Sequence, residues 1–190
     1  MEDKELIEKF LKGDRACFDE LIRRHKGLVF NLCLRMLGSY EEALDVSQDV
    51  FVKIYQSLKD FRFQASFKTY LYTVTLNFCR NKRKVLNRDK RQTAFSLDEP
   101  VRSGDDQLPR QLASSDDGPR DTADKHLRWD ILNLAMEMIS PEFREVLVLR
   151  EMQDLSYEEI AQALELDMGT VKSRLNRARL ALKEKLEGVL

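Results

Sequence analysis

Basic, hydroxyl and amide side chains gather near the C-terminal end of the chain, at a spacing that places them on one face of a helix. They are Thr170, Lys172, Ser173, Asn176, Arg177 and Arg179. Lysine and arginine bind phosphates or guanine edges, whereas serine and asparagine donate to or accept from several bases. This chemistry is suited to contact with nucleic acid. The alternative is the solvated outer face of a helical bundle.

A second group of residues, in the first half of the chain, alternates aromatic side chains with polar and basic ones. Its candidate binding residues are Arg62, Phe63, Gln64, Ser66, Asn77, Arg80 and Arg83. Single-stranded bases stack on aromatic faces while cations hold the backbone, so this composition is suited to a single strand. Apolar residues at helical spacing are also typical of a core, and this is our interpretation of Phe67, Leu71 and Phe78.

Residue groups that carry catalysis or hold metals are not found in the sequence. It contains no Gly-rich phosphate loop, nucleophile elbow or metal-ligand helix. Cys17, Cys33 and Cys79 form no close pair, and we interpret them as buried small hydrophobes. His25 and His126 lack a partner at ligand spacing and are interpreted as ordinary helix residues. We therefore expect no enzymatic activity, no cofactor and no metal.

The elements that must position these residues are expected to be helices. The chain has 190 residues, of which 34% are charged, with only 7 Gly and 4 Pro, too few for the many turns of a sandwich or barrel. The predicted fold class is all-α. No apolar run approaches the ~18 residues of a membrane span, and no signal sequence opens the chain. We expect a cytoplasmic protein without membrane insertion.

Charge is segregated along the chain although its net charge is only −1. Basic residues dominate 79–91 and 168–185, whereas 96–124 is acidic, contains three of the four prolines and has no aromatic residue. Such a segment cannot bury enough apolar surface to fold by itself. This acidic segment predicts that the chain is divided into three parts: a domain over 1–92, an acidic flexible linker over 93–126 and a domain over 127–190.

In the N-terminal half, apolar spacing predicts four helices. The first two are separated near Gly13, and Ser39 precedes Glu42 at the spacing of a capping box that opens the third. The fourth helix is predicted to begin near Ser66 and to run into the basic segment. Residues 59–65 are then a loop.

In the C-terminal half, the sequence predicts a helix-turn-helix. Ser140 followed by Pro141 opens one helix, and Ser156 with Glu159 forms a capping box that opens a short second one. A turn follows, and the last helix begins near Gly169. In a helix-turn-helix this last helix enters the major groove, where its N-terminal residues meet base edges.

Three segments resemble one known family, the extracytoplasmic-function (ECF, group IV) sigma factors of bacterial RNA polymerase, in the sigma-70 family. The segment LSYEEIAQALELDMGTVKSRLNRARLAL resembles their region 4, SFKTYLYTVTLNFCRNKRK resembles region 2, and EEALDVSQDVFVKIYQSL resembles the part that docks on the polymerase clamp. The resemblance implies a four-helix region 2 domain and a helix-turn-helix region 4 domain. It also implies a subunit that directs transcription initiation, with core RNA polymerase, promoter DNA and an anti-sigma factor as partners.

The resemblance also implies roles for individual residues. Binding to the polymerase clamp falls to Asp45, Gln48, Asp49 and Phe51. Reading of the minus-10 element falls to the aromatic and basic group, and reading of the minus-35 element to the group at 170–179. Residues 143–150 lie where the family contacts the polymerase flap. Tyr70 stands where the family usually has Trp, which keeps an aromatic core residue there. Asn176 occupies a position that is often aromatic, so the base preference at Asn176 is expected to differ.

The resemblance gives the acidic segment a mechanical role. As a flexible coil its 29 residues from 96 to 124 would span about 30 Å. Two promoter elements one and a half turns apart lie roughly 50 Å from each other. The linker must therefore stretch, and in the family it threads the nucleic-acid channel of the polymerase, whose walls suit an acidic chain.

Two other functions are compatible with parts of this pattern. A free-standing transcriptional repressor uses the same helix-turn-helix but needs a dimer interface to read paired half-sites, and the N-terminal half shows no zipper or symmetric seam. A sigma mimic that only sequesters an anti-sigma factor would not need the two basic faces.

Overall fold

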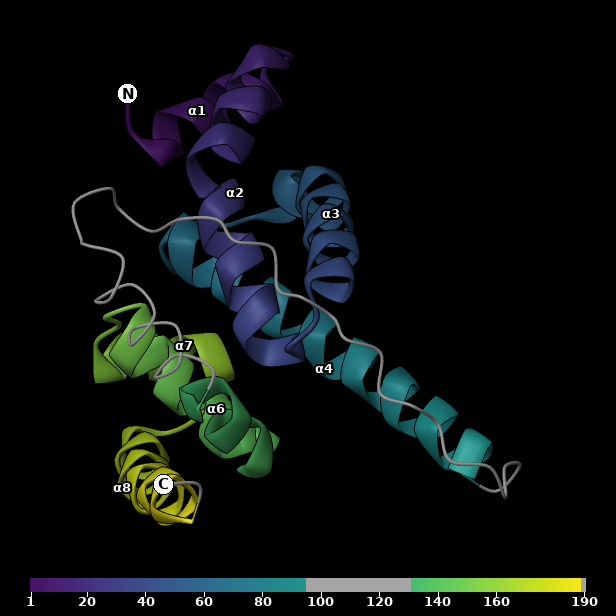
Figure 1. Ribbon diagram of the computed structural model, residues 1–190. Coiled ribbons are helices and arrows are strands. Elements are labelled where there is room, and N and C mark those ends of the chain that lie inside the picture. The colour runs from purple at the N-terminus through teal and green to yellow at the C-terminus, as the bar shows by residue number, and fades with distance from the viewer. Residues whose placement is uncertain (95–130, 189–190) are drawn as a thin grey trace, which may run out of the picture.

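The computed structural model describes the backbone of residues 1–94 and 131–188 and the side chains of 1–89 and 131–188. Both ranges are built from helices, without a strand in either of them, which confirms the all-α prediction (Figure 1). The acidic segment 96–124 and His126 lie outside the described residues. Among the helices described, none has the length and apolar character needed to cross a membrane.

The N-terminal module, residues 1–94, begins with α1 (Asp3–Leu11) and α2 (Ala16–Leu37), followed by α3 (Tyr40–Ser57), the short 3₁₀ helix η1 (Leu58–Asp60) and α4 (Phe67–Ala94). The four predicted helices are confirmed. Gly13 makes the first turn with φ of +104°, a value that favours glycine.

Two serines begin helices where the sequence predicts them, although the capping box predicted for Ser39 and Glu42 is only half formed, because the Glu42 carboxylate pairs with Lys82. Ser39 Oγ accepts from the N–H of Glu42 at 3.4 Å, and Ser66 Oγ accepts from the N–H of Thr69 at 3.0 Å. Each bond satisfies one backbone donor that the first helical turn leaves without a partner. The predicted loop 59–65 is shorter than expected, because η1 continues the chain from α3 as a 3₁₀ turn to Asp60.

The C-terminal module, residues 131–188, consists of the helical residues 131–138, α6 (Pro141–Leu147), the π-helical turn η2 (Val148–Met152), α7 (Tyr157–Leu164) and α8 (Met168–Glu187). Ser140 caps α6, as predicted. The capping box is complete, with Ser156 Oγ accepting from Glu159 N at 3.1 Å and the Glu159 carboxylate accepting from Ser156 N at 2.8 Å.

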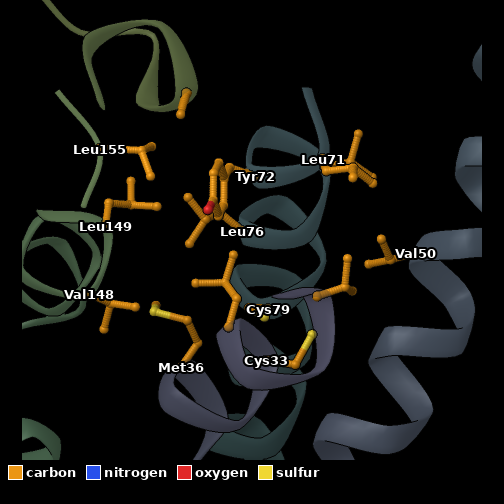
Figure 2. Packing of buried hydrophobic residues seen from close by; sticks show 14 of the residues in the cluster. Cys33, Met36, Val50, Leu71, Tyr72, Leu76, Cys79, Val148, Leu149 and Leu155 are labelled. Atoms are coloured by element: carbon orange, nitrogen blue, oxygen red, sulfur yellow. The ribbon is translucent and has the colours of Figure 1, made fainter. Parts of the chain in front are cut away.

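The two modules pack directly against each other, which the separate domains of the sequence did not predict. Helix α4 lies between α3 on one side and the C-terminal module on the other (Figures 1 and 2). Leu71 faces Val50 of α3, whereas Tyr72 and Leu76 face Leu149 of the C-terminal module (Figure 2). These side chains belong to a single buried cluster. Removal of this apolar surface from water stabilises the pairing of the modules.

A buried arginine also connects the modules. The side chain of Arg144 in α6 is only 3% exposed, and it donates from Nε to the carbonyl of Met136 at 2.7 Å and from Nη1 to the carbonyl of Met36 in α2 at 3.2 Å. Desolvation lowers the pKa of Arg144 to about 10, so the group still carries its charge at neutral pH. Arg144 therefore binds carbonyls in the last turns of two helices, one from each module.

The cysteines and the one described histidine lie where the sequence places them. Cys17, Cys33 and Cys79 are all buried, which confirms their interpretation as small core residues. His25 lies in α2, and its Nε2 is 2.8 Å from Oδ2 of Asp3. The described residues contain no group of three His, Cys, Asp or Glu side chains that could hold a metal ion.

Candidate nucleic-acid interface

The last two helices form the predicted helix-turn-helix. Glu165 makes the turn after α7 with φ of +55°, and α8 begins at Met168. Asp167 caps α8 by accepting from Thr170 N at 2.8 Å and from the Thr170 hydroxyl at 2.5 Å, and these bonds lower the pKa of Asp167. Ile160 and Val171 are buried where the two helices pack. The apolar faces thus fix α8, and its other face is left to solvent.

Four of the predicted minus-35 residues share that open face. Lys172, Ser173, Asn176 and Arg177 are all exposed on the first half of α8. The N-terminal half of a recognition helix is the part that reaches base edges. These four side chains are therefore available to DNA in this conformation.

The two remaining minus-35 candidates have partners within the chain. Thr170 is half-buried and holds the helix cap with Asp167. Arg179 is exposed and donates to Glu151 of η2 from Nε at 3.0 Å and from Nη2 at 2.6 Å, which raises the pKa of Arg179. Thr170 positions the reading face, and Arg179 must leave Glu151 before it can contact DNA.

A cavity of about 400 Å³ opens between the loop after η1 and the start of α4. Two of the predicted minus-10 residues, Arg62 and Gln64, lie in its wall. The N-terminal module also contributes Ser57, Asp60, Phe61, Ala65, Thr69, Tyr70 and Thr73 to the wall, and the C-terminal module contributes Gln162 and Glu165. The cavity therefore combines an aromatic face, a guanidinium and amide or hydroxyl groups, which are the groups that hold an unstacked base, with the carboxylates of Asp60 and Glu165 in the same wall.

The other two loop residues predicted to read the minus-10 element have different surroundings. Phe63 is 38% exposed and has a φ of +55°. The centroid of the Phe63 ring lies 4.9 Å from the centroid of the Phe61 ring and 5.7 Å from Nζ of Lys4. A positive φ is uncommon for a bulky residue and marks a loop held by its neighbours. Ser66, in contrast, is the cap of α4, so its side chain serves the helix rather than an open site.

The three minus-10 candidates on α4 lie one helical turn apart. Arg80 donates from Nη1 to Asn77 Oδ1 at 3.0 Å, and from Nε and Nη2 to the Glu145 carboxylate at 2.7 Å each. The hydrogen bond to Glu145 is the largest cause that raises the pKa of Arg80. Arg83 is half-buried, and its charge helps to lower the pKa of Arg144.

Three of the four predicted clamp-binding residues share the exposed face of α3. Asp45, Gln48 and Asp49 are exposed at positions three and four apart, whereas Phe51 is half-buried and packs on the core. The same helix also exposes the large apolar side chains of Leu44, Val52 and Tyr55. This mixed acidic and apolar surface has the composition of a protein-binding face.

The segment 143–150, predicted to contact the polymerase flap, is buried for most of its length. Only Phe143 and Arg150 are partly exposed. Next to it, a mostly apolar groove of about 390 Å³ is lined by Leu147, Glu151, Arg179, Leu182, Lys183, Leu186 and Glu187. The groove, rather than the segment itself, is the accessible surface in this region.

Sequence reasoning missed several residues of the interface. Thr69 and Thr73 lie on α4 at i, i+4 spacing with Asn77, a signal that could have found them. The sequence placed Tyr70 only as an aromatic core residue, whereas its hydroxyl lies 2.8 Å from that of Ser57 in the cavity wall. Glu145 carries no local signal, because it meets Arg80 across 65 residues of chain.

Comparison with known proteins agrees with this geometry. The family model for Sigma-70 region 2 matches residues 21–89, and the model for Sigma-70 region 4 matches residues 129–182. The RNA polymerase sigma-H factor of Pseudomonas aeruginosa is 29% identical over 190 residues, covering 100% of this chain and 96% of the relative. The ECF RNA polymerase sigma-E factor of Escherichia coli is 30% identical over 188 residues, and the match covers 99% of this chain and 96% of the relative.

Two solved structures share the fold. CnrH in complex with the cytosolic domain of CnrY has a TM-score of 0.68 at 23% identity, with 98% of this chain and 97% of that one covered. The sigma factor RpoE in complex with the anti-sigma factor NepR from Bartonella quintana has a TM-score of 0.64 at 23% identity, with 90% and 96% covered. Both family models and the full-length relatives lead to one conclusion: the chain belongs to the ECF RNA polymerase sigma factors of the sigma-70 family.

Proposed function

We propose that this sigma factor reads the minus-35 element with the exposed face of α8 and the minus-10 element with α4 and the loop before it. The observation that carries the proposal is the set of exposed donors on the first half of α8, Lys172, Ser173, Asn176 and Arg177, within a helix-turn-helix. Lysine and arginine there bind phosphate or guanine, and serine and asparagine discriminate among bases.

Minus-10 reading requires a base outside the stack. Extrusion costs a few kcal/mol, which contacts in the pocket must offset. The cavity with Arg62 and Gln64 in its wall supplies polar contacts, and Tyr70 and Phe61 supply aromatic ones. Asn77 and Arg80 follow along α4 and would hold the neighbouring backbone or bases.

Two surfaces are proposed to bind core polymerase. The exposed face of α3 with Asp45, Gln48 and Asp49 would bind the clamp, with Phe51 supporting the helix from its half-buried side. The apolar groove beside Leu147 would receive the flap. Each module is therefore proposed to carry one surface that binds the polymerase and one that binds DNA.

The remaining expectations follow from family membership. The chain acts as a polymerase subunit without catalytic activity of its own, and it works in the cytoplasm, where the polymerase is. An anti-sigma factor is a further proposed partner. Support comes from structural neighbours that were solved with the cytosolic domain of CnrY and with the anti-sigma factor NepR.

Run-off transcription with core polymerase on a library of promoters tests the function. The full chain should start transcripts at a restricted set of promoters, and the double variant Lys172→Ala, Arg177→Ala should lose those that need a minus-35 element. Lys26→Ala, which removes an exposed lysine from α2, is the matched control and should behave as wild type. No transcript from the wild-type holoenzyme, or tight promoter binding by a dimer without polymerase, would contradict the proposal.

A further inference from the structure

The first helix, α1, lies next to the loop that forms part of the minus-10 cavity. Leu6 and Ile7 of α1 are buried in the core, and the helix contacts both α2 and η1. The 3₁₀ helix η1 ends at Asp60, where the loop over 61–66 begins. The residues of the cavity wall lie in 57–73 and in α7 and the turn after it. Helix α1 is therefore outside the wall but in contact with the segment that leads into it.

An exposed lysine of α1 reaches this loop. Lys4 Nζ lies 5.7 Å from the centroid of the Phe63 ring, within the distance at which a cation is attracted to an aromatic face. The backbone of Phe63 has a φ of +55°, which a bulky residue keeps only where its neighbours hold it. The Phe61 ring is one such neighbour, with its centroid 4.9 Å from that of Phe63, and Lys4 is a second. Lys4 therefore helps to keep the loop in this conformation.

Asp3 attaches the same end of α1 to α2. His25 Nε2 lies 2.8 Å from Asp3 Oδ2, and the side chain of His25 is only 12% exposed. Next to His25, Arg24 donates from Nη1 to the carbonyl of Met1 at 2.8 Å and to Asp3 Oδ1 at 3.4 Å. These polar contacts bind the first turn of α1 to α2, so they also fix the position from which Lys4 reaches the loop.

A row of aromatic rings connects His25 with the cavity. The centroid of the His25 ring lies 5.4 Å from that of Phe67, the first residue of α4, at an interplanar angle of 74°. The Phe67 centroid lies 6.1 Å from that of Phe61, and the Phe61 centroid lies 4.9 Å from that of Tyr70. Phe61 and Tyr70 are both in the cavity wall. Rings at these distances favour tilted or edge-on arrangements, so each ring restricts the orientation of the next.

We infer that α1 is a positioning element of the minus-10 cavity, in which Lys4 holds Phe63 and the Asp3–His25 pair holds Phe67. The inference rests on the proposed role of that cavity in reading the minus-10 element. Lys4 and Asp3 lie outside the cavity wall, so they are positioning residues and not contacts of the bound base. Helix α1 thus keeps the loop, before DNA arrives, in the shape that receives an unstacked base.

The expected effect of α1 is on discrimination between bases. A loop that is already ordered costs less free energy to order when a base binds. The preferred minus-10 base makes the most contacts with the wall, so its binding suffers most when the loop is released, whereas a base that does not fit loses less. Recognition of the minus-35 element should stay unchanged, because α8 belongs to the other module.

The test uses the holoenzyme on a promoter that yields run-off transcripts, in competition with copies of that promoter that each differ in one base of the minus-10 element. The ratio of the two transcripts measures discrimination. Lys4→Gln should lower this ratio about threefold, the effect expected from losing an exposed contact between a cation and an aromatic ring. Lys4→Arg retains the cation and should keep the wild-type ratio. Asp3→Asn weakens the pair with His25 and should lower the ratio as Lys4→Gln does.

Two further variants serve as controls. Lys9→Gln removes another exposed lysine of α1 and should behave as wild type. Gln64→Ala changes the cavity wall itself and should lower the ratio whether or not α1 has a positioning role. Competition among promoters that differ only in the minus-35 element should give the same result for wild type, Lys4→Gln and Asp3→Asn.

The inference and the proposed function fail in different ways. With Gln64→Ala lowering the ratio, a wild-type ratio for Lys4→Gln, an equal loss for Lys4→Gln and Lys4→Arg, or a uniform loss of transcription on all minus-10 sequences would each overturn the inference alone. A wild-type holoenzyme that does not discriminate between minus-10 bases, or a Gln64→Ala variant with the wild-type ratio, would contradict the proposed function of the cavity and the inference with it.

Discussion

Arg80 and Arg177 are both proposed to contact DNA, but their surroundings in the free chain differ. Arg177 is exposed on α8, whereas Arg80 is bound to Asn77 and Glu145. An exposed side chain contributes to binding only through its contact with DNA. Arg80 must first exchange Glu145 for DNA, so substitution of Arg80 changes the free state and the bound state together. Arg177 is therefore the simpler position at which to measure a single contact.

Arg177→Ala should weaken binding of the holoenzyme to a promoter with a minus-35 element by ~1–3 kcal/mol if the guanidinium reads a base. The loss should be concentrated on promoters with the preferred base at one position, as measured by competition among promoters that differ in the minus-35 element. Lys26→Ala is the control. Equal losses on all sequences would assign Arg177 to a phosphate instead.

At the scale of single elements, the sequence predicted helix starts well because their signals are local. The capping box of Ser156 and Glu159 and the caps at Ser39 and Ser140 involve partners three residues apart. The end of α6 was not predicted, since the change from α-helical to π-helical bonding at Val148 leaves no mark on apolar spacing. Elements that depend on neighbouring residues are predictable, and those that depend on distant packing are not.

Ser156→Ala should lower the free energy of unfolding by ~1 kcal/mol, the usual cost of losing an N-cap. The alanine removes the acceptor for Glu159 N and leaves α7, the first helix of the helix-turn-helix, with a donor lacking its partner. Urea unfolding followed by circular dichroism measures the change. Ser156→Asp retains an acceptor at the cap and should be near wild type. Equal destabilisation by both substitutions would show that the cap is not the cause.

Glu20 on α2 gives a prediction about pH. Its carboxylate accepts from Arg23 at 2.7 Å and from Arg24 at 2.7 Å, and these bonds lower its pKa to about 2. Because the folded state favours the charged carboxylate, Glu20 adds to the free energy of unfolding at pH values above its ordinary pKa near 4.5. This stabilisation is lost as the pH falls toward 2. Urea midpoints of wild type and Glu20→Gln should differ at pH 6 and converge by about pH 2. A difference that persists there would contradict this assignment.

At the scale of the whole molecule, charge order along the chain predicted two basic surfaces but not their relation to each other. Local composition identified Lys172, Arg177 and Arg80 as candidates for DNA binding. It could not identify Glu145 as the partner of Arg80, because a pair separated by 65 residues depends on how two modules pack. The core shared by the two modules, with Tyr72 and Leu149 on facing helices, depends on how the modules pack together (Figure 2). It leaves no periodic signal in the sequence of either module.

The same charge order predicts how promoter binding responds to salt. Each phosphate neutralised by a lysine or arginine contributes about −0.9 to the slope of log K against log salt. The holoenzyme should therefore bind promoter DNA with a steep negative slope, measured by fluorescence anisotropy over a salt series. Lys172→Gln should make the slope shallower by about 0.9, since a lysine on α8 acts as a point charge toward phosphate. Lys26→Gln should leave the slope unchanged. A flat response of the wild-type holoenzyme would mean that these basic faces do not meet the DNA backbone, and both assignments of DNA-reading residues would have to be abandoned.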